Sequence, residues 1–204
     1  MKRVPLFFIA ALLTPVLVSA QSLLGTARIA HLPAPVKLDT TGRFQDAADR
    51  LGADVYISGQ PTAFGLRELR DSGVTTIVNL RTPTEMQRVP FDEAALARSL
   101  GMRYVSIPVR GDSTYPYSPE AVQRFADVMR TAKGKVLLHC TVGWRASHLW
   151  AAYLIKDRGL PVEEALANAR AINLMDGHHM SDSKRQPVEA FLGRDLPALG
   201  HGGR

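Results

Sequence analysis

Short runs of β-branched and apolar residues alternate with helical patterns about four times along the chain. The strand-like runs lie at residues 54–59, 74–80, 102–109 and 135–139. Helical spacing is found at residues 61–73, 91–101, 118–134, 145–159 and 161–172. This alternation is typical of parallel strands joined by helices. We therefore predict an α/β fold, a three-layer sandwich with a mostly parallel central sheet of about four or five strands.

The two ends of the chain have a different character from its middle. Residues 1–20 combine a positive start, an apolar run and small residues at the exit, which predicts a signal peptide and a periplasmic or secreted protein. An uncleaved N-terminal anchor is the alternative. Residues 21–50 are rich in proline and turn residues and predict an irregular N-terminal arm. We expect one domain over residues 51–195 and a frayed tail over residues 196–204.

Charge and composition narrow the range of partners. The chain has 204 residues, a formal net charge of +6 and ordinary globular composition, with positive residues scattered along it. A nucleic-acid-binding chain would be expected to show a basic tract, so we predict no nucleic-acid partner. We also predict no membrane contact once the signal is removed, and a monomer. The mild positive bias suits a small anionic substrate.

Cys140 is the only cysteine of the chain, so no internal disulfide can form. Exported proteins usually meet an oxidising compartment, where a free thiol is exposed to oxidation. The thiol is therefore either protected by burial or kept for chemistry. A lone cysteine after an apolar strand is most often a core residue, and this reading stays open beside the catalytic one.

The residues after Cys140, TVGWR, favour a catalytic role because they lead from a strand into a predicted helix. The first turn of a helix leaves backbone N–H groups unpaired and carries positive partial charge, which attracts anions and favours a thiolate. Gly143 can adopt the backbone angles that turn successive N–H groups inward. Arg145 adds a planar guanidinium group, which can bind a phosphate-like oxyanion through two parallel N–H groups. A nucleophile, an anion cradle and a charge clamp together suit attack on phosphorus.

Three residues in or next to this loop each have two alternative roles. His139 is either a structural histidine or orients the loop and supports the thiolate. Ser147 either donates a hydrogen bond to the sulfur or caps the helix. Trp144 either lines the mouth of the pocket or packs against a neighbour.

A thiol phosphatase also needs a general acid to protonate the leaving oxygen. Asp112 follows the preceding strand, and parallel strands would bring its loop to the same sheet edge as Cys140. The alternative is an aspartate that only stabilises a Gly-Asp-Ser turn. Arg81 follows another strand and either faces the pocket or forms a surface ion pair with Glu85.

No cofactor or metal is expected. Asp176, His178 and His179 lie together in the sequence, but they lack the spacing of a defined metal site.

The sequence HC…G…R after a strand resembles the signature loop of the protein-tyrosine and dual-specificity phosphatase superfamily. Residues 54–172 are similar to the small bacterial branch that includes the beta-lactamase-hydrolase-like phosphatases. The resemblance implies a cysteine phosphatase-like fold. It also implies an enzyme that hydrolyses phosphate monoesters through a phosphocysteine, with phosphotyrosine as the candidate substrate. It implies Cys140 as nucleophile, Arg145 as phosphate-binding arginine and Asp112 as acid. Backbone N–H groups would come from Thr141, Val142, Gly143 and Trp144.

The loop departs from the superfamily pattern in one respect. Four residues separate Cys140 from Arg145, where the superfamily usually has five. The shorter loop also resembles that of rhodanese-like sulfurtransferases, so a persulfide carrier on Cys140 is the alternative enzyme. A non-catalytic anion-binding module is the third hypothesis, and it gives no reason to keep an oxidisable thiol.

Overall fold

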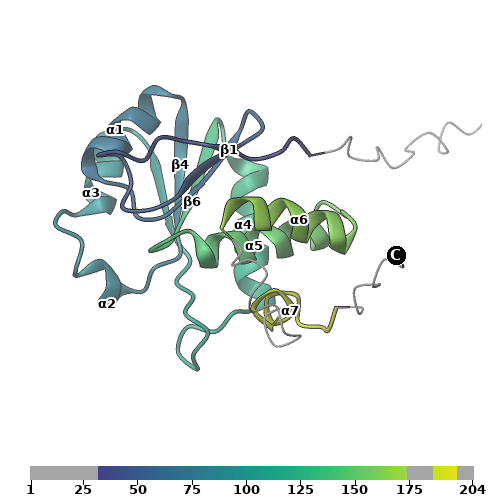
Figure 1. Cartoon of the computed structure of the whole chain (residues 1–204). Helices are drawn as coiled ribbons and strands as arrows, with labels where there is room; N and C mark the ends of the chain where they lie inside the picture. The colour runs from purple at the N-terminus through teal and green to yellow at the C-terminus, as the bar shows by residue number, and fades with distance from the viewer. Residues whose placement is uncertain (1–31, 174–185, 197–204) are drawn as a thin grey trace, which may run out of the picture. The chain divides into compact units, whose positions relative to one another are not determined.

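The computed structural model describes residues 32–173 and 186–196, which form a six-stranded sheet flanked by helices (Figure 1). The strands are β1 (Val36–Lys37), β2 (Ala48–Leu51), β3 (Val55–Ser58), β4 (Val74–Asn79), β5 (Arg103–Ser106) and β6 (Lys135–His139). The helices are α1 (Ala63–Asp71), α2 (Pro83–Met86), α3 (Glu93–Ser99), α4 (Pro119–Thr131), α5 (Trp144–Lys156), α6 (Val162–Ile172) and α7 (Gln186–Leu192).

The strand order β1-β2-β3-β6-β4-β5 places β6 in the middle of the sheet. Strands β3, β6, β4 and β5 run parallel, with Leu138 of β6 opposite Ile57 of β3 and Val78 of β4. The apolar run of β6 is buried, as expected for a central strand covered on both faces. The predicted α/β fold with a mostly parallel sheet is confirmed.

The sheet has six strands rather than the predicted four or five, because β1 and β2 pair antiparallel at the edge next to β3. β1 and the first three residues of β2 lie within residues 21–50, which we predicted to be an irregular arm. The prediction failed there because β1 is two exposed residues and β2 reads ADRL, which has no clear apolar alternation. Pairing with the neighbouring strand, rather than local sequence, makes these residues extended.

The helices form two layers (Figure 1). On one side of the sheet, α1 contacts β4, α3 contacts β5, and the two helices contact each other. On the other side, α4, α6 and α7 pack around α5. A core cluster that includes Phe44, Tyr56 and Leu66 fills the first side. On the second side, the ring of Phe125 packs edge-on against Trp150 and Tyr153 of α5. Helix α5 is therefore held firmly behind the loop that contains Cys140.

The connection from β3 to α1 is tied to the chain before β2. The Thr62 side chain caps α1 by accepting a hydrogen bond from the Gly65 N–H, at 3.0 Å, and the Thr62 N–H donates to the Arg43 carbonyl, at 2.9 Å. A Cβ on Gly65 would overlap that same carbonyl, so the approach requires glycine. These contacts hold Gln60, which lies next to the Cys140 loop.

Some predictions fall outside the described residues. These are the signal peptide at residues 1–20, most of the tail at residues 196–204, and the group Asp176, His178 and His179. Within residues 32–173 and 186–196, no helix is both long and apolar enough to span a bilayer.

Candidate active site

Cys140 directly follows β6, at the carboxyl edge of the parallel strands. Its backbone N–H donates to the Ser58 carbonyl, 3.3 Å away at the end of β3, and only 1% of the residue is exposed. Four residues later the chain is inside α5, which begins at Trp144. The predicted strand–loop–helix arrangement around the cysteine is therefore present.

The loop turns its carbonyl groups toward its neighbours. The Thr141 carbonyl accepts the Gln60 N–H, at 3.0 Å, and the Val142 carbonyl accepts the side-chain amide of Asn173. Among the described residues, the N–H groups of Thr141 and Val142 have no hydrogen-bond acceptor. Together with the unpaired N–H groups of the first turn of α5, they can form an anion cradle.

Gly143 makes the tight turn into α5. It is the N-cap of the helix with φ of 85°, a left-handed conformation that other residues adopt only with strain. A Cβ at this position would lie about 3.5 Å from the Ser58 backbone, an ordinary van der Waals contact, so the requirement for glycine comes from the backbone angle. The predicted role of Gly143 in shaping the loop therefore has a steric basis.

The Arg145 side chain is fixed by groups from three other segments. Its Nη1 lies 3.0 Å from Glu85 Oε2, 2.8 Å from the Val109 carbonyl and 3.4 Å from the Leu80 carbonyl. Its Nη2 lies 2.6 Å from Glu85 Oε1 and 2.9 Å from Thr141 Oγ1. The Nε–H has no acceptor among the described residues, so it is the donor left for an oxyanion.

Glu85 is the principal partner of Arg145 and was not assigned to the site by the sequence. It belongs to the one-turn helix α2, where it forms a capping box with Thr82. Burial would raise the pKa of Glu85, but hydrogen bonds from Arg145 and Thr82 outweigh burial and lower the pKa to about 2. The carboxylate is therefore ionised at neutral pH and stabilises the guanidinium charge.

Of the two interpretations of Arg81, the surface ion pair with Glu85 is not seen. Arg81 is only 7% exposed, and its Nη1 donates to Gln60 Oε1, at 2.5 Å. It contacts Glu85 only through the backbone carbonyl, at 3.0 Å from Nη2. Its Nε has no partner among the described residues. Burial lowers the pKa of Arg81, and the nearby charges of Glu85 and Cys140 act in the opposite direction.

His139 and Ser147 are both fully buried, but only His139 contacts the cysteine. Its Nδ1 lies 3.4 Å from the Cys140 carbonyl oxygen, and its Nε2 lies 2.8 Å from Glu93. The Ser147 hydroxyl instead donates to the Gly143 carbonyl, at 2.8 Å. The hydroxyl is therefore not seen bonded to the sulfur. Ser147 also lies inside α5, whose N-cap is Gly143, so it does not cap the helix.

Asp112 lies on the exposed loop after β5, which also supplies the Val109 carbonyl to Arg145. Its carboxylate accepts the N–H groups of Thr114 and Tyr115, at 3.0 and 2.8 Å, and lies 3.6 Å from Arg110 Nε. No contact with Cys140 or Arg145 is present in the described part of the chain. The turn-stabilising role is therefore visible in this structure.

Two aromatic residues lie around the loop. Tyr117 is half-buried against Phe191 of α7, with ring centroids 5.0 Å apart. Burial raises the pKa of Tyr117, and the positive charge of Arg145 acts in the opposite direction. Trp144 is half-buried and packs on His148, at 4.2 Å between ring centroids. Trp144 therefore does pack against a neighbour.

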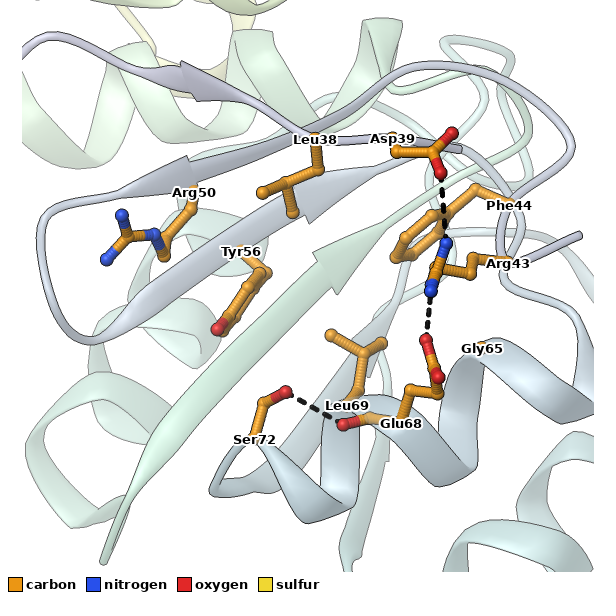
Figure 2. A pocket seen from close by; sticks show the side chains of 10 residues that line it. All are labelled: Leu38, Asp39, Arg43, Phe44, Arg50, Tyr56, Gly65, Glu68, Leu69 and Ser72. Atoms are coloured by element: carbon orange, nitrogen blue, oxygen red, sulfur yellow. Dashed lines mark hydrogen bonds and ion pairs between the residues drawn. The ribbon is translucent and has the colours of Figure 1, made fainter. Parts of the chain in front are cut away.

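A separate cavity of about 350 Å³ lies between the β1–β3 region and α1 (Figure 2). Phe44, Tyr56 and Leu69 give it apolar walls, and Arg43 is paired with both Asp39 and Glu68 at its rim. It has no cysteine, so we do not assign the reaction to it. Within the described ranges, no group of three or more His, Cys, Asp or Glu residues could hold a metal ion.

The Arg145–Glu85 pair predicts an acid-sensitive contribution to stability. The pKa of Glu85 is lowered from 4.5 to about 2 on folding, so its contribution is complete above pH 4.5 and is lost as the pH falls toward 2. Glu85→Gln should lower the free energy of unfolding at pH 7 by about 1–3 kcal/mol and flatten its decline below pH 4.5. Urea unfolding at several pH values measures both effects.

The control for this experiment is Glu163→Gln on the exposed surface of α6, which should change stability by less than about 0.5 kcal/mol. An unchanged acid slope in Glu85→Gln would contradict the assigned ion pair.

Comparison with known proteins gives the family. A family model described as "DSP-PTPase phosphatase fused to NAD+ Kinase" matches residues 27–186. The chain is similar to a beta-lactamase hydrolase-like protein of Xylella fastidiosa strain 9a5c, with 32% identity over 151 residues, 72% of this chain and 33% of that protein. It thus spans about a third of that relative.

Two further relatives agree with this match. Human dual specificity protein phosphatase 26 is 30% identical over 128 residues, which cover 60% of this chain and 58% of that protein. The crystal structure of a DUF442 protein from Shewanella putrefaciens CN-32 superposes with a TM-score of 0.56 at 26% identity, covering 74% of this chain and 95% of that chain. The chain therefore belongs to the dual-specificity and protein-tyrosine type of phosphatase family.

Proposed function

We propose that this protein is a cysteine-dependent phosphatase that hydrolyses phosphate monoesters through a phosphocysteine on Cys140. The observation that carries the proposal is the loop from Cys140 to Arg145. The carbonyl groups of Thr141 and Val142 are bound by neighbouring segments, their N–H groups have no acceptor among the described residues, and Arg145 is anchored by Glu85. Family membership supports the same chemistry.

In the first step the Cys140 thiolate attacks phosphorus. An S–P bond forms, the P–O bond to the leaving alcohol breaks, and a general acid gives its proton to the leaving oxygen. The Thr141 and Val142 N–H groups, the first turn of α5 and the Arg145 Nε–H would stabilise the non-bridging oxygens. In the second step water attacks phosphorus, the S–P bond breaks, and the deprotonated acid takes up the proton from water.

We keep Asp112 as the proposed acid because its loop is the one that contacts Arg145 through Val109. The exposed turn would have to bring the Asp112 side chain toward the substrate. Substrate-dependent closure of such loops is common in enzymes, and apo geometry alone does not exclude a candidate acid.

The proposal also names a substrate class and a compartment. Phosphotyrosine is the proposed substrate class, supported by the family to which the chain belongs. Export to the periplasm or the medium is supported by the sequence of residues 1–20.

Replacement of the nucleophile gives the first test. Cys140→Ser should reduce hydrolysis of 4-nitrophenyl phosphate by roughly 10³-fold or more, because a serine hydroxyl is a much weaker nucleophile at neutral pH. Ser99→Ala, on the exposed end of α3, serves as the control and should retain activity. Equal rates for wild type and Cys140→Ser would reject the proposal. Incubation with thiosulfate should add no sulfur mass to Cys140, and a stable persulfide would instead indicate sulfur transfer.

The acid can be tested through the leaving group. Asp112→Asn keeps an oxygen that can accept the turn hydrogen bonds but has no proton to donate. Its kcat should fall by about 10²-fold for phenyl phosphate and much less for 4-nitrophenyl phosphate, whose leaving group needs little protonation. Asp127→Asn on α4 is the control. An equal loss for both substrates, or no loss, would assign Asp112 to the turn alone.

A further inference from the structure

The cavity between the β1–β3 region and α1 takes no part in the proposed reaction. Its volume of about 350 Å³ is within the range of protein sites for small molecules. Phe44, Tyr56 and Leu69 form its walls and are buried, with 8%, 7% and 5% of each residue exposed. Figure 2 shows Arg50 at one end of the cavity and Arg43 with its carboxylate partners at the other. The cavity is therefore apolar in its middle and charged at both ends.

The charged groups at the Arg43 end are already paired. Arg43 Nη1 lies 3.1 Å from Asp39 Oδ2, and Arg43 Nε contacts Glu68 Oε2. One guanidinium lies between two carboxylates, so this end has an excess of negative charge and repels an anion. The anionic group of a ligand would therefore be directed to the opposite end of the cavity.

Two positive charges flank Tyr56 at that opposite end. Arg50 is the partner of Tyr56 in the pairing of β2 with β3, so the two side chains leave the same face of the sheet. On the other neighbouring strand, β6, Lys135 Nζ lies 6.0 Å from the centre of the Tyr56 ring. Within residues 32–173 and 186–196, neither Arg50 nor Lys135 has a carboxylate partner. A bound anion would supply the missing counter-charge.

The Tyr56 hydroxyl is a second polar group that lacks a partner. Only 7% of Tyr56 is exposed, yet its hydroxyl makes no hydrogen bond to any described residue. Buried tyrosine hydroxyls usually have a hydrogen-bond partner. Because Tyr56 lines the cavity, the oxygen of a ligand is well placed to accept this bond.

We propose that this cavity is a second ligand site of the protein, which binds a small aromatic carboxylate. Its ring would lie between Phe44, Tyr56 and Leu69, because aromatic walls favour offset or edge-on contacts with another ring. Its carboxylate would accept hydrogen bonds from the Tyr56 hydroxyl and from Arg50, whose exposed side chain is free to turn toward it.

The charge of the ligand follows from the same surroundings. A single negative charge fits better than the double charge of a phosphate monoester, because the apolar walls and the carboxylates of Asp39 and Glu68 oppose a second one. The cavity includes no residue of the Cys140 loop, so the inference stands apart from the proposed phosphatase reaction.

The first test locates the bound ligand in the full chain. Naphthalene-2-carboxylate is titrated into the protein, and the backbone amide signals are followed by NMR. The signals of Leu38, Tyr56 and Leu69 should shift and saturate. Naphthalene-2-carboxamide, which has nearly the same shape and no charge, should bind about tenfold more weakly. Equal affinity for the two compounds, shifts confined to the Cys140 loop, or no saturable binding would overturn the proposal.

The second test assigns the polar contacts. Arg50→Gln should abolish the preference for the carboxylate, whereas Arg50→Lys keeps the charge and should retain most of it. Tyr56→Phe keeps the ring and should weaken carboxylate binding by about threefold, the effect of one lost hydrogen bond. Arg130→Gln, on the exposed surface of α4 across the sheet, is the control and should bind like the wild type. An unchanged preference in Arg50→Gln would refute the site.

Discussion

The ion pair between Arg145 and Glu85 is the interaction on which the site depends. A guanidinium with 11% of its side chain exposed needs acceptors for its donors, and Glu85 provides two oxygens in the planar arrangement that matches it. The carbonyl groups of Leu80 and Val109 complete the set. Because four segments of the chain meet at this one side chain, Arg145 is in place before any substrate arrives.

The fold explains why these segments meet. β6 lies between β3 and β4, and β5 lies beside β4, so the loops that leave their carboxyl ends share one edge of the sheet. The loop after β6 holds Cys140, the one after β4 leads to Glu85, and the one after β5 carries Val109. The Gln60 segment after β3 supports the Cys140 loop from the other side. Helix α5 directs its first turn at the same place.

The strand, loop and helix around Cys140 could be predicted because the signal is local: an apolar run, a glycine that must turn left-handed, and a helical pattern. Glu85 was missed as the partner of Arg145 because α2 is a single turn, too short for helical periodicity. The Ser147 hydroxyl donates to the carbonyl four residues earlier, at Gly143, and the sequence does not show this choice of acceptor. Partners brought together by tertiary contacts have no local signature.

The most direct measurement looks for the covalent intermediate. The protein is mixed with an excess of an aryl phosphate, quenched in acid within the first turnovers, and analysed by peptide mass spectrometry. The account predicts one phosphoryl group on the peptide that contains Cys140. Rapid hydrolysis of the ester with Cys140 unmodified, or with the phosphoryl group on another residue, would contradict it.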